Sequence, residues 1–325
     1  MTLRGRVFQL GQAGMAVLRE ASAAAGMLFK IMIPIIIGVK VLQELGLIPY
    51  LARPLAPIME IVGLPGSMGL VWATALVNNL YAAMVVYFSL AADDPLTCAQ
   101  ITILATMMLM AHALPLEGKI AQKAGTRFIF QALARAGGAF IVGWVLHLGY
   151  SATGWLQEPS RLFWEPAETG SGGLGFWALD QVRNLAMIFC IILVLVALMR
   201  LLQYFGVTQA LVRVLQPVLR LLGISGEAAP IAIVGMTMGL AYGGGLILHE
   251  AKSGRVARQD IFFSLTLMGL CHSIIEDTLL MTLLGAHVSG LLWARLLFSL
   301  LFVFLLVRLV RALPASLINR FLYQQ

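Results

Sequence analysis

A run of ionisable residues interrupts an otherwise apolar segment in the second half of the chain. His272, Glu276 and Asp277 stand in the stretch CHSIIEDT, which covers residues 271–278. Polar side chains at membrane depth are costly, so they are candidates for function. His272 and Glu276 are four residues apart and would share one face of a helix, where they could bind a cation, relay a proton or hydrogen-bond a solute. The structural alternative is a pair that only bridges neighbouring helices.

A corresponding stretch lies in the first half, from His112 to Lys119, and its Glu117 aligns with Asp277. Pro115 should open the helix there and free backbone carbonyls that a cavity can use. We expect a coupling ion, a proton or sodium, and no other cofactor. The predicted ion-coupling residues are His112, Glu117, His249, Glu250, His272, Glu276 and Asp277.

A glycine-rich segment, GMTMGLAYGGG over residues 235–245, is the second candidate. Each glycine weakens a helix by about 1 kcal/mol relative to alanine. The segment could therefore unwind in the membrane and bind ions or solutes, or it could allow close helix packing. Its first-half counterpart places two asparagine amides that suit a neutral polar solute. The predicted solute contacts are Asn78, Asn79, Tyr242, Gly243, Gly244 and Gly245.

These stretches correspond because the chain repeats itself at a fixed offset of 160 residues (272 − 112). Chance matches many leucines, but it rarely matches histidine, arginine, proline and glycine in one register. The pairs include Gly46 with Gly206, Pro57 with Pro217, His112 with His272, Gly125 with Gly285 and Arg135 with Arg295.

The composition of the 325 residues is that of a membrane protein, with 60% hydrophobic and only 11% charged residues. A soluble domain carries about 25% charged residues, and a spanning helix needs roughly 20 apolar ones. The net charge of +7 comes without a basic patch of interleaved aromatics, so we expect no nucleic-acid partner. No phosphate-binding loop, dinucleotide fingerprint or nucleophile–base constellation indicates an enzyme. The sequence predicts an all-α polytopic membrane protein.

We expect about ten membrane segments, five in each half. They cover residues 24–46, 48–63, 66–91, 98–116 and 127–150, then 184–205, 207–222, 227–250, 259–282 and 287–312. Five crossings are an odd number, so the second half would be inserted upside down, as in inverted-repeat transporters. Four crossings per half would instead give parallel repeats.

Loop charges favour the inverted arrangement with both termini in the cytoplasm, because basic loops stay on that side. The Asp93–Asp94 turn would then lie outside. The basic residues that would lie inside are Lys119, Lys123, Arg127, Lys252, Arg255, Arg258, Arg308, Arg311 and Arg320. We expect a multi-pass protein of the bacterial cytoplasmic membrane that could form homo-oligomers.

The predicted organisation has five parts: an amphipathic surface helix over 1–26, repeat 1 over 27–150, a linker over 151–182, repeat 2 over 183–312 and a tail over 313–325. The linker carries Trp155, Trp164 and Trp177, which favour the bilayer interface. Paired positive charges, among them Arg135 with Arg295 and Arg53 with Arg213, are interpreted as snorkelling near interfaces; the alternative is contact with an anionic substrate.

The glycine-rich segment, the following His249–Glu250 pair and the stretch CHSIIEDTLL resemble the Gate, or nucleoside-recognition, membrane proteins. That superfamily includes spore maturation proteins, the membrane part of ferrous-iron transporters and concentrative nucleoside transporters. The resemblance implies a gradient-driven transporter of a small polar, nucleoside-like solute. Alternatives are a divalent metal transporter with His, Glu, Cys and Met ligands, a non-transporting membrane scaffold, and a transporter of an anionic lipid or phosphate compound.

Overall fold

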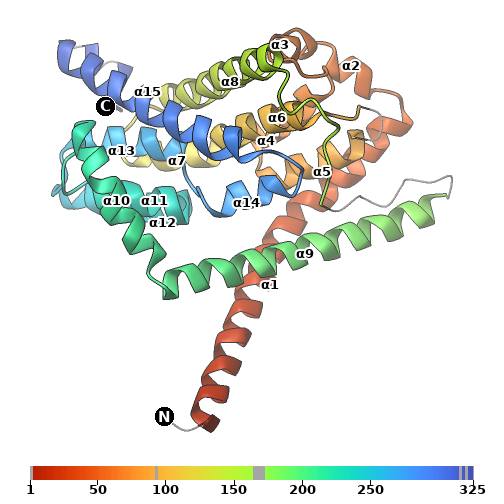
Figure 1. The fold of residues 1–325 in the computed structure, drawn as a ribbon, viewed down its shortest axis with the longest axis horizontal. Helices are drawn as coiled ribbons and strands as arrows, with labels where there is room; N and C mark the ends of the chain where they lie inside the picture. Colours follow the sequence, from red (N-terminus) through yellow and green to blue (C-terminus); the bar gives the residue numbers. More distant parts are fainter. Residues whose placement is uncertain (1–2, 92–93, 164–172, 315–316, 319–320, 325) are drawn as a thin grey trace.

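The computed structural model describes residues 3–91, 94–163, 173–314, 317–318 and 321–324, and these residues are predominantly helical (Figure 1). The all-α expectation is confirmed. Five segments of the described chain are long and apolar enough to cross a membrane: Gly14–Glu44, Cys98–Lys123, Phe128–Thr153, Leu174–Tyr204 and Ser289–Ala312. The described residues thus do not show ten spanning helices. Several of the expected spans are instead divided into shorter helices.

The two halves present their helices in the same order. The first contains α1 (Leu3–Glu44), α2 (Ile48–Ala52), α3 (Ala56–Ile61), α4 (Met68–Val77), α5 (Leu80–Leu90), α6 (Cys98–Met110), α7 (Leu114–Lys123) and α8 (Phe128–Thr153). The second contains α9 (Leu174–Tyr204), α10 (Val207–Leu221), α11 (Ala229–Met238), α12 (Leu240–Ser253), α13 (Arg258–Leu270), α14 (Glu276–Thr282), a π-helical turn η1 (Ser289–Ala294) and α15 (Arg295–Ala312).

The long helices α1 and α9 cross each other beside the bundle of shorter helices (Figure 1). Ala21, Ala25 and Met32 of α1 form an apolar cluster there with Ile188 and Ile192 of α9. Helix α1 runs without a break through residue 26, where the sequence suggested that a surface helix ends. Helix α9 begins at Leu174, within the stretch assigned to the linker.

Helices α4 and α5 form a hairpin in place of the single crossing helix expected over 66–91. They have 10 and 11 residues, so each spans about 15 Å, half of a bilayer core of about 30 Å. Their outer ends meet, because the Ser67 hydroxyl donates to Asp94 Oδ2 at 2.5 Å. The chain reverses at Asn78 and Asn79, where the Asn79 side chain caps α5 by accepting from the Ala82 amide.

The second half repeats this construction with α11 and α12, which have 10 and 14 residues and pack against each other. Gly239 separates them with φ +87° and ψ 167°, a conformation that is essentially restricted to glycine. The expected single helix over 227–250 is therefore also corrected to two helices. Gly239 stands at the position that corresponds to Asn79, the cap of α5, in the first half.

Two further helices are interrupted beside these hairpin turns. Ala113 (φ 48°) separates α6 from α7, and Ser273 (φ 45°) lies between α13 and α14. The Ala113 amide donates to the carbonyl of Ala75, near the end of α4, at 2.9 Å. The Ile274 amide likewise donates to the Met236 carbonyl of α11 at 2.9 Å. Each interruption is thus hydrogen-bonded to the hairpin of its own half.

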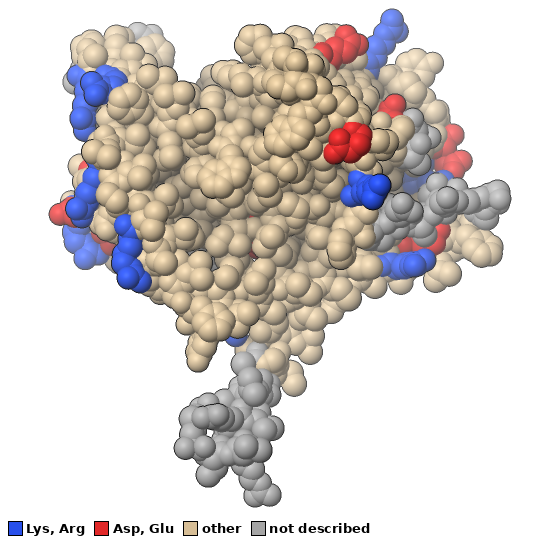
Figure 2. All heavy atoms as spheres, viewed as in Figure 1, with Lys and Arg blue, Asp and Glu red and all other residues tan. Residues whose placement is uncertain are grey.

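The surface separates apolar and charged regions. Leu297, Leu301 and Leu305 recur every four residues along α15 and are 70%, 52% and 56% exposed, as expected for a face that contacts lipid. Figure 2 shows a broad central surface almost without charge, with Lys and Arg along its left edge and both acidic and basic residues toward its right side. The loop before α8 and the loop before α13 both contact the C-terminal segment. Arg127 donates to the Tyr323 carbonyl, and Arg258 stacks over the Tyr323 ring.

Candidate functional site

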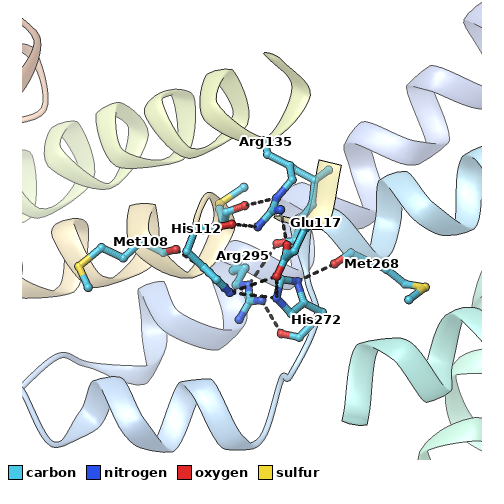
Figure 3. Close-up of polar contacts among 9 residues, drawn as sticks. Met108, His112, Glu117, Arg135, Met268, His272 and Arg295 are labelled. Carbon is cyan, nitrogen blue, oxygen red and sulfur yellow. Dashed lines mark hydrogen bonds and ion pairs between the residues drawn. The ribbon is translucent and has the colours of Figure 1, made fainter. Parts of the chain in front are cut away.

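The two histidines predicted from the repeat meet in the interior of the molecule (Figure 3). His112 and His272 are 7% and 3% exposed, and their Nε2 atoms are 3.1 Å apart. Each Nδ1 lies 2.9 Å from a backbone carbonyl four residues earlier, of Met108 and Met268 respectively. The interruptions of α6 and α13 turn both rings toward the same point, since neither histidine lies in a regular helix.

Glu117 joins the histidine pair from the first turn of α7. Its Oε1 lies 3.3 Å from His272 Nε2 and 3.7 Å from His112 Nε2, while its Oε2 accepts from Arg135 Nη1. The carboxylate therefore connects the histidines to a buried arginine. We call His112, Glu117 and His272 the His–His–Glu cluster. It is a group of side chains in the described chain whose donor atoms could hold a metal ion.

Arg135 and Arg295 hold the ends of the two interrupted helices. Arg135 donates from Nε to the Met110 carbonyl and from Nη2 to the His112 carbonyl. The equivalent bonds of Arg295 reach the carbonyls of Leu270 and His272, at 3.2 and 2.5 Å. Carbonyls at a helix C-terminus lack intrahelical partners and carry partial negative charge, so each guanidinium both caps and neutralises its helix end.

These arginines correct the sequence interpretation, which assigned them to the membrane interface. Arg135 and Arg295 are 3% and 1% exposed, whereas Arg53 and Arg213 are exposed. The sequence analysis missed the first pair as site residues. The signal that could have identified them is their position well inside apolar segments of both repeats, rather than at segment ends.

The halves differ at the residue that faces each arginine. Glu117 pairs with Arg135, but Asp277, its counterpart, has a side chain shorter by one methylene and no hydrogen bond to Arg295. Arg295 Nη1 is buried without a hydrogen-bond partner. His272 and Glu276 do not share a helix face, because α14 begins only at Glu276. Glu276 and Asp277 instead lie in the first turn of α14, where both are partly buried.

The predicted solute contacts are only partly brought to this region. Asn78 and Asn79 form the α4–α5 turn, and Asn79 Nδ2 donates to Asn78 Oδ1 at 3.0 Å. Residues 243–245 are not unwound, because they lie within α12 and the interruption is at Gly239 instead. Gly245 is exposed. The side chain of Tyr242, like the surroundings of Gly243 and Gly244, lies outside the described part of the structure.

His249 and Glu250 are not brought to the cluster, because both lie in the last turns of α12, at the end away from the reversal at Gly239. His249 is exposed on α12. Glu250 Oε1 accepts from Arg255 Nη2 at 2.7 Å and Glu250 Oε2 accepts from the Ser253 hydroxyl. Glu250, Ser253 and Arg255 therefore form a local network at the basic end of the molecule.

A cavity of about 520 Å³ lies at the outer end of the α4–α5 hairpin. Its polar lining comes from Gln43, Ser67 and Asp94. The volume suits a small organic ligand, but the lining residues are at the end of the hairpin opposite to its Asn78–Asn79 turn. The cavity is therefore separate from the His–His–Glu cluster.

Comparison with known proteins supports the family resemblance. Residues 185–286 match the family model described as Gate, nucleoside recognition, and this range contains both motifs on which the resemblance was based. The chain is also 26% identical over 271 residues to the uncharacterized membrane protein YvoD of Bacillus subtilis (strain 168), an alignment that covers 82% of this chain and 85% of YvoD. No solved structure matches the chain significantly.

Proposed function

We propose that this membrane protein, whose second half carries the Gate nucleoside-recognition match, is a gradient-driven transporter of a small polar solute with nucleoside-like chemistry. The observation that supports the proposal is the meeting of two hairpins and two interrupted helices around the His–His–Glu cluster. Non-helical backbone is tolerated at membrane depth only where protein or a water-filled cavity surrounds it. Secondary transporters build their sites from such discontinuous helices at the interface of two repeats.

The proposed topology has three crossings and one hairpin in each half. In the first half, α1, the interrupted helix α6–α7 and α8 would cross, while α4–α5 would enter and leave on one side. In the second half, α9, α13–α14 and α15 would cross, with α11–α12 as the hairpin. Three crossings per half are an odd number, as the five expected from the sequence were, so the second half would still be inverted relative to the first. The basic end around Arg127 and Arg258 then faces the cytoplasm, together with both termini.

The residues divide into four roles under this proposal. Glu276 and Asp277 are partly buried in the first turn of α14 and carry the coupling proton or sodium ion. Asn78, at the hairpin turn, contacts the solute. His112, Glu117 and His272 come from both halves and form the junction across which the halves move. Arg135 and Arg295 position the interrupted helix ends, without which the junction would lose its geometry.

Uptake into proteoliposomes tests the proposal. Tritiated uridine and adenosine would be supplied under an inward proton or sodium gradient, with protein-free liposomes as the background. We expect gradient-dependent uptake by the wild type, its loss in Glu276→Gln, and normal uptake in Glu158→Gln, which changes an exposed carboxylate. Uptake at the protein-free level for both nucleosides under both gradients would overturn the proposal for this solute class.

A further inference from the structure

Three hydrogen-bond acceptors converge in the His–His–Glu cluster. A carbonyl oxygen can only accept, so the Nδ1 atoms of His112 and His272, each 2.9 Å from one, must both carry hydrogen. In the neutral rings, both Nε2 atoms then present lone pairs, and they face each other at 3.1 Å. Glu117 Oε1 faces the same point. Three lone pairs directed at one another repel unless an electropositive species lies between them.

The separations of these atoms identify that species. They are 3.1 Å between the two nitrogens and 3.3 and 3.7 Å from each nitrogen to Glu117 Oε1. Metal–ligand bonds of about 2.0–2.1 Å in a tetrahedral zinc site put neighbouring ligand atoms roughly 3.3 to 3.4 Å apart. A shared proton would join only two of the three acceptors, whereas a metal ion joins all of them. We propose that His112 Nε2, His272 Nε2 and Glu117 Oε1 bind one divalent first-row transition-metal ion of the Zn²⁺ class, with a fourth position open.

The surroundings of the cluster are those of a metal site. Ligating histidines usually donate their second ring N–H to a carbonyl or carboxylate, which fixes the ring, and both histidines do so here. Arg135 holds the second oxygen of Glu117 and so fixes its orientation. Two imidazole nitrogens among three ligands favour zinc and its neighbours over Mg²⁺ or Ca²⁺, which prefer oxygen.

A divalent cation in the cluster would lie near two buried, positively charged arginines, so the surrounding negative charge has to be considered. Arg135 and Arg295 add two positive charges, but both are bonded to helix-end carbonyls that carry partial negative charge. Glu117 supplies the carboxylate that faces both histidine Nε2 atoms. The cation would be the common partner of ligands from both halves, since His112 and Glu117 belong to the first half and His272 to the second. It would therefore link the halves at the junction about which they move.

Metal binding to the purified full-length protein tests this proposal. After removal of metals with a chelator, the protein in detergent would be equilibrated with Zn²⁺, and bound zinc would be measured by mass spectrometry. We expect about one Zn²⁺ per chain, and a loss of affinity of roughly tenfold or more in His112→Gln and in His272→Gln. His249→Gln, which changes an exposed histidine, is the matched control and should bind as the wild type does. Stoichiometric binding that neither cluster variant reduces would overturn the proposal.

A second measurement serves if the cluster variants fail to fold. Co²⁺ added to the wild type should give the intense visible absorption of a tetrahedral site, and Zn²⁺ but not Mg²⁺ should raise the melting temperature. Absence of both effects would overturn the proposal. Neither readout requires a gradient or a solute. Zinc binding without uptake would remove only the transport proposal, and uptake without zinc binding would remove only the metal site.

Discussion

His112 and His272 occupy the same position in the two halves of the chain, and their Nε2 atoms are 3.1 Å apart although 160 residues separate them in sequence. A residue touches its own counterpart only close to an axis that relates the two copies. Gly138 and Phe298 are another such pair, because a Cβ on Gly138 would lie 2.9 Å from the Phe298 ring. This is the arrangement expected if a local two-fold axis passes through the centre of the site.

Replacement of Arg135 by methionine should destabilise the protein strongly. The change leaves the Glu117 carboxylate without its ionic partner and the Met110 and His112 carbonyls without their donor. Breaking a buried ion pair in this way costs about 3–5 kcal/mol. Thermal unfolding in detergent, followed by circular dichroism, would measure it. Arg53→Met, at an exposed position, is the control, and equal melting temperatures for the two variants would contradict the capping role of Arg135.

Substitutions at Ala113 should separate backbone strain from side-chain contacts. Its φ of 48° is unfavourable for a β-branched residue, so Ala113→Val should cost about 1–3 kcal/mol. Ala113→Gly should be close to neutral, because relief of strain offsets the greater freedom of the unfolded chain. Melting temperatures would show the difference, with Ala210→Val on the exposed face of α10 as the reference. Similar effects of valine at both positions would argue against the interruption of α6–α7.

Two glycine substitutions in one segment should have opposite effects. Gly239→Ala should be destabilising, because Gly239 has φ +87° and a Cβ there would lie 2.7 Å from the Ser273 hydroxyl. Gly245→Ala should stabilise α12 by up to about 1 kcal/mol, since a Cβ there meets nothing within 4 Å. Comparison of the two melting temperatures locates the interruption. Stabilisation by Gly239→Ala would contradict a chain reversal at that residue.

The repeat drew attention to three residues whose side chains the structure brings together. His112, Glu117 and His272 are polar residues in apolar segments. The common offset identifies them without any knowledge of where the helices begin and end. Their mutual contact could not be predicted, because a sequence repeat does not state where its symmetry axis passes. The roles of Arg135 and Arg295 were misjudged for a related reason: a snorkelling arginine and a buried one look alike until the carbonyls that they reach are known.

The two hairpins could not be predicted from the hydropathy of the sequence. An apolar run such as residues 66–91 has the same hydropathy whether it crosses the bilayer once or turns back halfway. Asn79 was the available signal, since asparagine is a favoured helix cap, but it was interpreted as a solute contact. In the second half, three consecutive glycines drew the interpretation to residues 243–245, although the single Gly239 makes the turn.

The proposed inversion of the two halves requires that α4–α5 enters and leaves the membrane on one side. The direct test is the accessibility of Ser67→Cys to a membrane-impermeant thiol reagent, in a variant in which Cys98, Cys190 and Cys271 are replaced. We expect this cysteine to be labelled from the same side as Glu158→Cys, because Ser67 bonds to Asp94 at the outer end of the hairpin. A single crossing by residues 66–91 would place it on the opposite side, with Arg127→Cys, and labelling from that side would rule out the hairpin topology.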